Sequence, residues 1–237
     1  MKFNPFVILF LTITLYLSGQ TEPGRLYMFC HSEPTVKDHE GNIYRTVQIG
    51  SQCWMAENMR CTTSPTGKTW LHNPSFTASH PLYAAYYANP IIERYGILYN
   101  WAAAMDIYDN HHKNTKGDAY HRGICPAGWH LPNSKEWEQL FDELGGNHVA
   151  GELMKSSSQL WEPYAVTIRD VGGFDATPAG AYTEDGYRYS TMQALFWSST
   201  SFSKSQAWCA IIYDFKSEIY NYLDYKCYGH SVRCVKD

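Results

Sequence analysis

Alternating residue polarity predicts a short β-strand over residues 43–49. The two interleaved sets are Ile43, Arg45, Val47 and Ile49 against Tyr44, Thr46 and Gln48, which is the period-2 pattern of a strand. Residues 38–42 have turn chemistry, because Gly41 and Asn42 supply the positive φ that a tight hairpin requires. A second turn at residues 50–51 leads into an apolar stretch over 53–55, which predicts a second short strand.

A helix is predicted over residues 134–144. Asn133 and Glu136 have the spacing of an N-x-x-E capping box, and Pro132 blocks an earlier start. Four apolar residues then recur at helical spacing and form one face, namely Trp137, Leu140, Phe141 and Leu144. Glycines at 145 and 146 end this helix, and a second short helix is expected over residues 147–155.

Beyond residue 156, strand-like segments alternate with glycine-rich turns. The predicted strands cover residues 195–199, 207–213, 218–223 and 231–235. Earlier in the chain, residues 97–101 fit either a buried strand or the start of a helix through 104, whereas 62–90 are loop-like and 109–122 are polar. Helices followed by antiparallel strands favour the α+β class.

One domain is expected over residues 37–237, because no repeat, charge run or low-complexity tract divides them. Residues 20–36 carry Pro, Gly and Ser without periodicity and are interpreted as a leader or linker.

The first 19 residues have the pattern of a secretory signal peptide. Lys2 supplies a positive charge, residues 6–17 are almost entirely apolar, and Ser18-Gly19 allow cleavage before Gln20. The apolar run falls short of the ~20 residues that a membrane span needs, so no span is expected after cleavage. An uncleaved anchor is the alternative. We expect the chain to be exported, to the periplasm, to the outer cell surface or as a secreted protein.

The charge composition argues against nucleic-acid binding. Removal of Lys2, the only charged residue of the first 19, changes the formal net charge from −4 to −5, and the chain contains no Lys/Arg run. Charged residues make up 18% of the chain, below the roughly 25% of ordinary soluble domains. Aromatic residues reach 16%, led by 19 Tyr. Hydroxyl and amide groups therefore carry much of the surface polarity, as they often do in extracellular recognition proteins.

Seven cysteines occur, at positions 30, 53, 61, 125, 209, 227 and 234. In the oxidising compartment that export implies, such cysteines usually pair. Seven is odd, so at least one cysteine is expected to be free or to pair with another chain. The spacing contains no C-x-x-C, which favours disulfides over a metal site.

Seven sequence blocks, in order, resemble the Fibrobacter succinogenes major paralogous domain family. They are GNIYRTVQIG at 41–50, QCWMAENM at 52–59, YGILYNW at 95–101, CPAGWHLPNSKEW at 125–137, GF at 173–174, FWSST at 196–200 and SVRCV at 231–235. The resemblance spans residues 37–237. The family is common in exported proteins of Bacteroidota and Fibrobacteres. Its biochemical activity is undefined, and surface adhesion or ligand binding is the usual interpretation.

The family is similar in pattern to C-type-lectin-like domains of the formylglycine-generating-enzyme branch. The resemblance implies a C-type-lectin-like α+β fold of small twisted antiparallel sheets with two helices, in which the two chain ends lie close together. If the ends meet, Cys125 before the helix and Cys234 in the last strand are expected to pair. The closed loop of about 110 residues would contribute roughly 4–5 kcal/mol in the chain-entropy model.

Two further disulfides are candidates. Cys209 and Cys227 flank a hairpin-like segment and are expected to form a local disulfide. Cys53 and Cys61 are near enough in sequence for a third, which leaves Cys30 odd.

A tyrosine-rich segment is the candidate ligand face, because the resemblance implies that residues 201–230 correspond to the ligand-binding loops and strands of C-type-lectin-like domains. The candidate ligand-binding residues are Tyr213, Tyr220, Asn221, Tyr222, Asp224 and Tyr225, together with Tyr187 and Tyr189 from the preceding segment. Tyrosine supplies a large and stiff contact surface. The alternative is that these side chains merely cover the sheet. The tryptophans within the family blocks are expected to pack in the core, namely Trp54, Trp101, Trp129, Trp137 and Trp197.

Motifs for a metal or a catalytic centre are missing or incomplete. Calcium-dependent lectins use Glu-Pro-Asn and Trp-Asn-Asp clusters, whereas this chain has WEPY at 161–164 and WSS at 197–199. No Gly-x-Ser-x-Gly elbow is present. Four histidines lack the i, i+4 spacing of a helical metal site, namely His111, His112, His121 and His130.

These observations favour an exported, non-catalytic binding domain without cofactor or metal, which recognises a glycan or a protein ligand at the bacterial cell surface independently of calcium. The alternative is a structural subunit or cap of a surface assembly, in which Cys30 or another odd thiol joins chains into a disulfide-linked oligomer. A third hypothesis is an oxidase of the formylglycine-generating type, which needs reactive cysteines in a cleft. Cys227 and Cys234 lie near the C-terminus, but the surrounding blocks lack the catalytic pattern.

Overall fold

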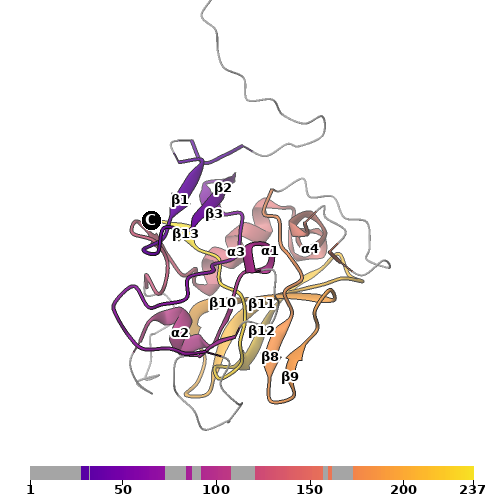
Figure 1. Ribbon diagram of the computed structural model, residues 1–237. Coiled ribbons are helices and arrows are strands. Elements are labelled where there is room, and N and C mark those ends of the chain that lie inside the picture. Colours follow the sequence, from indigo (N-terminus) through magenta and orange to yellow (C-terminus); the bar gives the residue numbers. More distant parts are fainter. Residues whose placement is uncertain are drawn as a thin grey trace, which may run out of the picture.

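The computed structural model describes residues 28–31, 33–72, 84–86, 92–107, 121–156, 160–161 and 173–237, whose arrangement is shown in Figure 1. The regular elements of this part are mainly antiparallel strands, with a few helices, which confirms the α+β class. The predicted signal peptide at 1–19 and much of the expected loops at 62–90 and 109–122 lie outside the described residues. Within the described ranges, no helix is long and apolar enough to cross a membrane.

The first sheet joins strands from the two ends of the described chain. Its order is β1 (Thr35–Lys37), β2 (Ile43–Ile49), β3 (Gln52–Met55), β13 (Val235–Lys236) and β7 (Trp129–His130), and all neighbours are antiparallel. Strand β13 lies between β3 and β7, because Val235 is opposite both Trp54 and His130. The early and late strands therefore lie side by side, as the resemblance implied.

The turn before β2 is closed by a side chain as well as by the backbone. The Asp38 carboxylate accepts hydrogen bonds from the backbone N–H of Asn42 at 2.9 Å and from the Tyr44 hydroxyl at 2.7 Å. Gly41 adopts φ +93° at this turn. The predicted strand over 43–49 is confirmed. Within this strand, Ile43 is exposed and Tyr44 is buried.

The second sheet is an antiparallel meander of β10 (Gln193–Ser201), β11 (Gln206–Tyr213) and β12 (Ile219–Tyr225). One face packs on helices α3 (Ser134–Glu143) and α4 (Asn147–Met154), through a core that contains Phe196, Ile212 and Trp137. The other face contributes Trp197 and Cys209 to a second core. The strands predicted at 195–199 and 207–213 are confirmed, and 218–223 is confirmed from residue 219. The strand predicted at 231–235 is reduced to an isolated bridge at Ser231 and the start of β13.

Helix α3 begins as the sequence predicts. The Asn133 side chain accepts from the backbone N–H groups of Lys135 and Glu136, and the Glu136 carboxylate accepts from the Asn133 N–H at 2.8 Å, which completes the capping box. Its apolar face is buried from Trp137 to Phe141. Glycines 145 and 146, both at positive φ, reverse the chain into α4.

Smaller elements connect the two sheets. Strand β4 (Leu71–His72) pairs in parallel with β5 (Ala84–Tyr86), which pairs antiparallel with β6 (Leu98–Tyr99), and β8 (Ala181–Thr183) forms a hairpin with β9 (Gly186–Arg188). Short helices α1 (Ile92–Tyr95) and α2 (Trp101–Met105) complete the described elements. The segment 97–101 thus holds a strand followed by a helix start, where the Asn100 side chain accepts from the Ala103 N–H at 2.9 Å.

Two disulfides are present. Cys125 pairs with Cys234 across a sequence separation of 109 residues, which confirms that prediction. The Cys53–Cys61 prediction is wrong, because Cys53 pairs with Cys30, the cysteine expected to be odd. The reason lies in residues 28–31 and 33–37, which run along the first sheet through a bridge from Met28 to Gln48 and through β1. This segment is part of the sheet rather than a free linker.

The predicted Cys209–Cys227 disulfide is also wrong, since both cysteines are free. The strand register explains why. Gln206 is opposite Tyr225 at the end of the β11–β12 ladder, so Cys227 lies in the turn beyond it, whereas Cys209 lies three residues inside it. Three residues of strand span about 10 Å, and a disulfide requires Cα atoms within about 7 Å.

Candidate functional site

The register of the β10–β11–β12 sheet sorts the predicted ligand residues onto its two faces. Ile211 is opposite Tyr220, and Cys209 is opposite Tyr222. Because strand side chains alternate between faces, the candidates Tyr213, Tyr220, Tyr222 and Asp224 lie on the Cys209 face. Asn221 and Tyr225 lie on the face that packs against α3 and α4. The sequence pattern alone did not separate these two sets.

On the Cys209 face, six side chains form what we call the tyrosine cluster: Tyr189, Tyr213, Phe215, Lys216, Tyr220 and Tyr222. The Tyr213 ring lies 5.6 Å from the Phe215 ring and 6.1 Å from the Tyr220 ring, measured between centroids. The Lys216 ammonium lies 5.0 Å from the Tyr220 ring centroid and within 5.4 Å of the other two, a cation–π geometry. These contacts hold a cation among three aromatic faces.

Most of the tyrosine cluster is open to solvent. The exposed fractions are 46% for Tyr189, 54% for Phe215, 39% for Tyr220 and 51% for Tyr222. Among its aromatic members, only Tyr213, at the centre, is half-buried. Its pKa is raised by burial first and then by the neighbouring Tyr222, Cys209, Tyr220 and Tyr189. The cluster therefore presents several aromatic side chains together rather than scattered singly.

Strand position explains this exposure. On β10 and β11 the same face is covered by the second core, so Trp197, Cys209 and Ile211 are buried. Strand β12 is an outer strand of the sheet, and its alternate side chains, Tyr220 and Tyr222, extend beyond that cover.

The remaining predicted ligand residues are not brought into the tyrosine cluster. Tyr187 donates its hydroxyl hydrogen to the Ala179 carbonyl at 2.8 Å and packs against a small core. The Asn221 side chain contacts the Glu138 carboxylate on α3. Tyr225 packs against Tyr228 with ring centroids 5.5 Å apart, and Asp224 turns toward His230.

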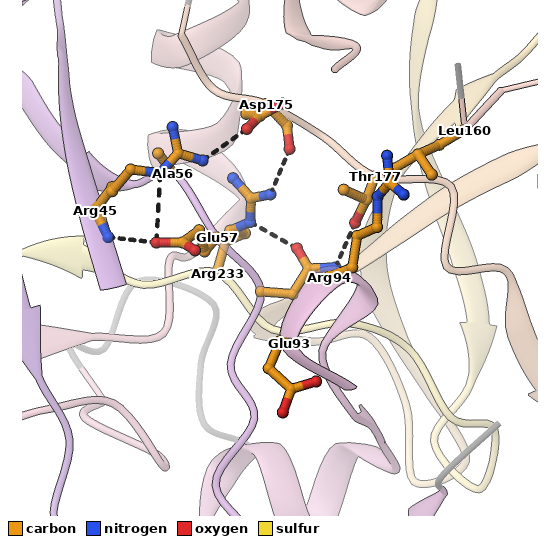
Figure 2. Close-up of a pocket in the computed structure, with 10 residues that line it drawn as sticks. Arg45, Ala56, Glu57, Glu93, Arg94, Leu160, Asp175, Thr177 and Arg233 are labelled. Atoms are coloured by element: carbon orange, nitrogen blue, oxygen red, sulfur yellow. Dashed lines mark hydrogen bonds and ion pairs between the residues drawn. The ribbon is translucent and has the colours of Figure 1, made fainter. Parts of the chain in front are cut away.

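A polar pocket of about 180 Å³ lies elsewhere, between the first sheet and α1. Figure 2 shows Arg45 in contact with both Glu57 and Asp175 on one side, Arg233 at the centre, and Arg94 on the other side. The Arg45 guanidinium lies 2.7 Å from the Asp175 carboxylate and 3.6 Å from that of Glu57. Three arginines and three carboxylates line the pocket, so their formal charges balance.

The wall of this pocket is a buried hydrogen-bond network that sequence reasoning missed. The fully buried Arg233 donates to the Asn58 side chain at 2.7 Å and to the backbone carbonyls of Met55, Phe174 and Asp175. Asn58 in turn donates to the Tyr95 carbonyl at 2.8 Å. The network joins four distant segments, so its first role is to hold them together. The available signal was a lone arginine within the apolar SVRCV block.

The structure does not activate the free thiols as nucleophiles. Burial raises the pKa of Cys61, and burial followed by the charge of Asp224 raises that of Cys209. Burial also raises the pKa of Cys227, the one half-buried member of the three. A reactive cysteine needs a lowered pKa, so these surroundings do not favour a cysteine nucleophile.

The other sequence candidates serve packing or lie outside the described residues. The five tryptophans of the family blocks are buried, which confirms their core role, and so are Ser198 and Ser199 beside Trp197. His130 lies between the carboxylates of Glu136 and Asp237, at 2.7 and 2.9 Å. His111, His112 and residues 162–164 lie outside the described part. Among the described residues, one group brings three potential metal-ligand atoms within 4.8 Å of one another, namely those of Cys209, Asp224 and His230.

Residues 47–236 match the model of the Fibrobacter succinogenes major domain. No curated protein and no solved structure matches the chain.

Proposed function

The chain belongs to the Fibrobacter succinogenes major domain family, and we propose that it is a non-catalytic recognition domain that binds a glycan through the tyrosine cluster. The observation that carries this proposal is the exposure of four aromatic side chains around the half-buried Tyr213. Aromatic residues that gather at the surface are typical of binding sites, whereas single exposed ones are not.

The chemistry of the cluster suits a sugar. The faces of Tyr220 and Tyr222 are flat apolar platforms for the C–H groups of a pyranose ring, and their hydroxyl groups donate and accept hydrogen bonds at the edge. Lys216 adds a donor between the rings. These groups reach sugar hydroxyls directly, so recognition needs no calcium ion.

We also propose that the fold is C-type-lectin-like and that the chain is exported. The paired early and late strands, the two helices and the Cys125–Cys234 disulfide support the fold. Two disulfides support an oxidising compartment, as does the apolar run at residues 6–17.

A glycan array probed with the purified, oxidised full chain, with and without a calcium chelator, tests this proposal. We expect binding to a defined glycan that survives chelation. Tyr220→Ala combined with Tyr222→Ala should then weaken that binding by at least about tenfold, since each ring that stacks is worth on the order of 1 kcal/mol. The melting temperature should change little, because both side chains are about half exposed.

Tyr225→Ala is the matched control. Tyr225 is a tyrosine of the same strand, 49% exposed, but it lies on the opposite face. Its removal should leave glycan binding unchanged. Equal loss in the control, a large drop in melting temperature of the double variant, or silence across the array would contradict the tyrosine-cluster reading.

Assembly through a disulfide between chains is a second candidate, favoured by the three unpaired cysteines. Cys61 and Cys209 are buried, so Cys227 is the thiol that a second chain could reach. A dimer on non-reducing electrophoresis that disappears in Cys227→Ser would support this role. A monomer in the oxidised wild-type chain would contradict it.

A further inference from the structure

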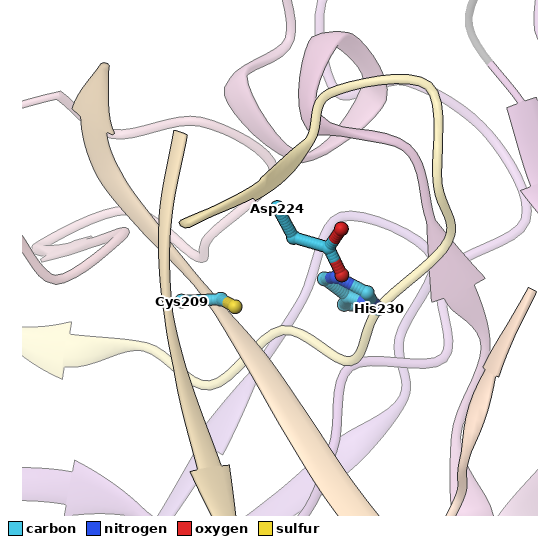
Figure 3. A group of neighbouring side chains, drawn as sticks. All are labelled: Cys209, Asp224 and His230. Atoms are coloured by element: carbon cyan, nitrogen blue, oxygen red, sulfur yellow. The ribbon is translucent and has the colours of Figure 1, made fainter. Parts of the chain in front are cut away.

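Three side chains of different donor type meet beside the second core. The Cys209 sulfur, an Asp224 carboxylate oxygen and a His230 ring nitrogen all lie within 4.8 Å of one another. Figure 3 shows the Cys209 sulfur and the Asp224 carboxylate directed toward the His230 ring. Cys209 and His230 are buried, while the Asp224 side chain is 15% exposed and leaves an approach from solvent.

Rigid elements hold each of the three. Cys209 and Asp224 lie on one face of neighbouring strands, because Tyr222, two residues from Asp224, is opposite Cys209. The backbone of His230 is fixed by two hydrogen bonds with Tyr99, at 2.8 and 3.0 Å. The Trp197 ring packs on its imidazole, with centroids 4.2 Å apart.

The imidazole is oriented as it is in metal sites. His230 Nδ1 lies 2.9 Å from the Gly229 carbonyl oxygen, so it donates there, and Nε2 points to Asp224 Oδ2 at 3.0 Å. A metal-bound histidine usually donates its second ring N–H to such a carbonyl, which fixes the tautomer and aims the other nitrogen at the ion. Here Nε2 is the nitrogen aimed into the group.

We propose that Cys209, Asp224 and His230 bind a zinc ion. Tetrahedral zinc with bonds of about 2.0–2.3 Å places its ligand atoms roughly 3.3–3.7 Å apart. The His230–Asp224 pair is already near this separation, and the sulfur moves inward by on the order of 1 Å. One thiolate and one carboxylate neutralise the ion, and imidazole, thiolate and carboxylate together are a donor set that zinc accepts.

Protons leave when the ion enters. The Cys209 thiol loses its proton as the Zn–S bond forms, and the ion replaces the proton held between His230 and Asp224. Both protons go to solvent. Three protein ligands leave the fourth position for water. None of the three ligands is a member of the tyrosine cluster, although Cys209 is opposite Tyr222, so glycan binding and zinc binding can fail separately.

Cobalt(II) titration of the full chain, freed of metal by a chelator, tests the proposal because cobalt reports its ligands by absorption. We expect one equivalent to produce a thiolate-to-cobalt charge-transfer band in the near ultraviolet and visible bands of tetrahedral intensity, which zinc then abolishes. Cys209→Ser should lose the charge-transfer band. Cys61→Ser is the matched control, since Cys61 is an equally buried thiol outside the group, and it should keep the band.

Asp224→Asn provides a second variant if Cys209→Ser does not fold. It keeps the shape of a partly exposed side chain and should weaken cobalt binding at least about tenfold, the loss seen even for outer partners of metal ligands. Absence of the charge-transfer band in the wild-type chain would overturn the proposal. A band that survives Cys209→Ser but disappears in Cys227→Ser would also overturn it, because the thiolate would then be the wrong one.

Discussion

Gly151→Ala in α4 is expected to destabilise the protein, although the same change in an ordinary helix stabilises it. Alanine is the better helix former by about 1 kcal/mol. At this position, however, an added Cβ would lie 2.6 Å from the Glu218 carbonyl oxygen and 2.8 Å from the Ser217 carbonyl oxygen. Both obstacles are backbone atoms at the start of β12, so no side-chain rotation relieves the contact.

The size of the effect follows from these contacts. The added methyl group must push α4 away from residues 217–218 by several tenths of an ångström. Overpacking of this kind costs roughly 1–3 kcal/mol. It also stretches the hydrogen bond from the Glu152 N–H to the Ser217 carbonyl, now 3.0 Å long, which is worth about 1 kcal/mol. After subtraction of the propensity gain, the free energy of unfolding should fall by about 1–3 kcal/mol.

Urea unfolding followed by tryptophan fluorescence measures this change as a lower midpoint at unchanged slope. His148→Ala is the matched control, because His148 is an exposed residue of the same helix, and it should stay within about 0.5 kcal/mol of the wild type. A Gly151→Ala variant as stable as the wild type, or more stable, would refute the close approach of α4 to β12.

Two further predictions concern stability. The paired change Cys125→Ser and Cys234→Ser opens a loop of 109 residues and should lower the free energy of unfolding by roughly 5 kcal/mol. Loss of the Cys30–Cys53 disulfide, which closes a loop of 23 residues, should lower it by about 3.5 kcal/mol. Urea unfolding of the two variants measures both values, and the reverse order would contradict loop length as the cause. Burial lowers the pKa of Lys155, whose ammonium donates to the carbonyls of Asp214 and Lys216, from 10.5 to about 8. Between these two pH values the folded state therefore holds fewer protons than the unfolded state. The free energy of unfolding of the wild type should consequently rise, relative to that of Lys155→Met, by up to about 3 kcal/mol as the pH rises from 8 to 10.5. Urea unfolding of both proteins across this range checks the sign, and a flat or falling difference would show that folding does not lower the pKa of Lys155.

The Asn133–Glu136 capping box, the apolar face of α3 and the strand over 43–49 could be predicted from the sequence alone. Each depends on contacts between residues only a few positions apart, where helical and strand periodicity act. The ordered blocks likewise revealed the family, and through it the Cys125–Cys234 pairing.

Only the tertiary structure decided which residues meet across long separations. Cys30 reaches Cys53 because an early segment runs along the first sheet, which the composition of residues 20–36 did not indicate. The register between β11 and β12 decides which tyrosines lie on each face of the sheet. A shift of a single residue would exchange Tyr222 for Asn221 on the open face.

The pocket around Arg233 and the group of Cys209, Asp224 and His230 could not be predicted from the sequence either. Their members come from segments that share no local pattern. The sequence by itself determined the local elements, because backbone hydrogen bonds and residue periodicity are short-range. The tertiary structure alone decided the candidate sites, because strand register and core packing choose which distant side chains share a face.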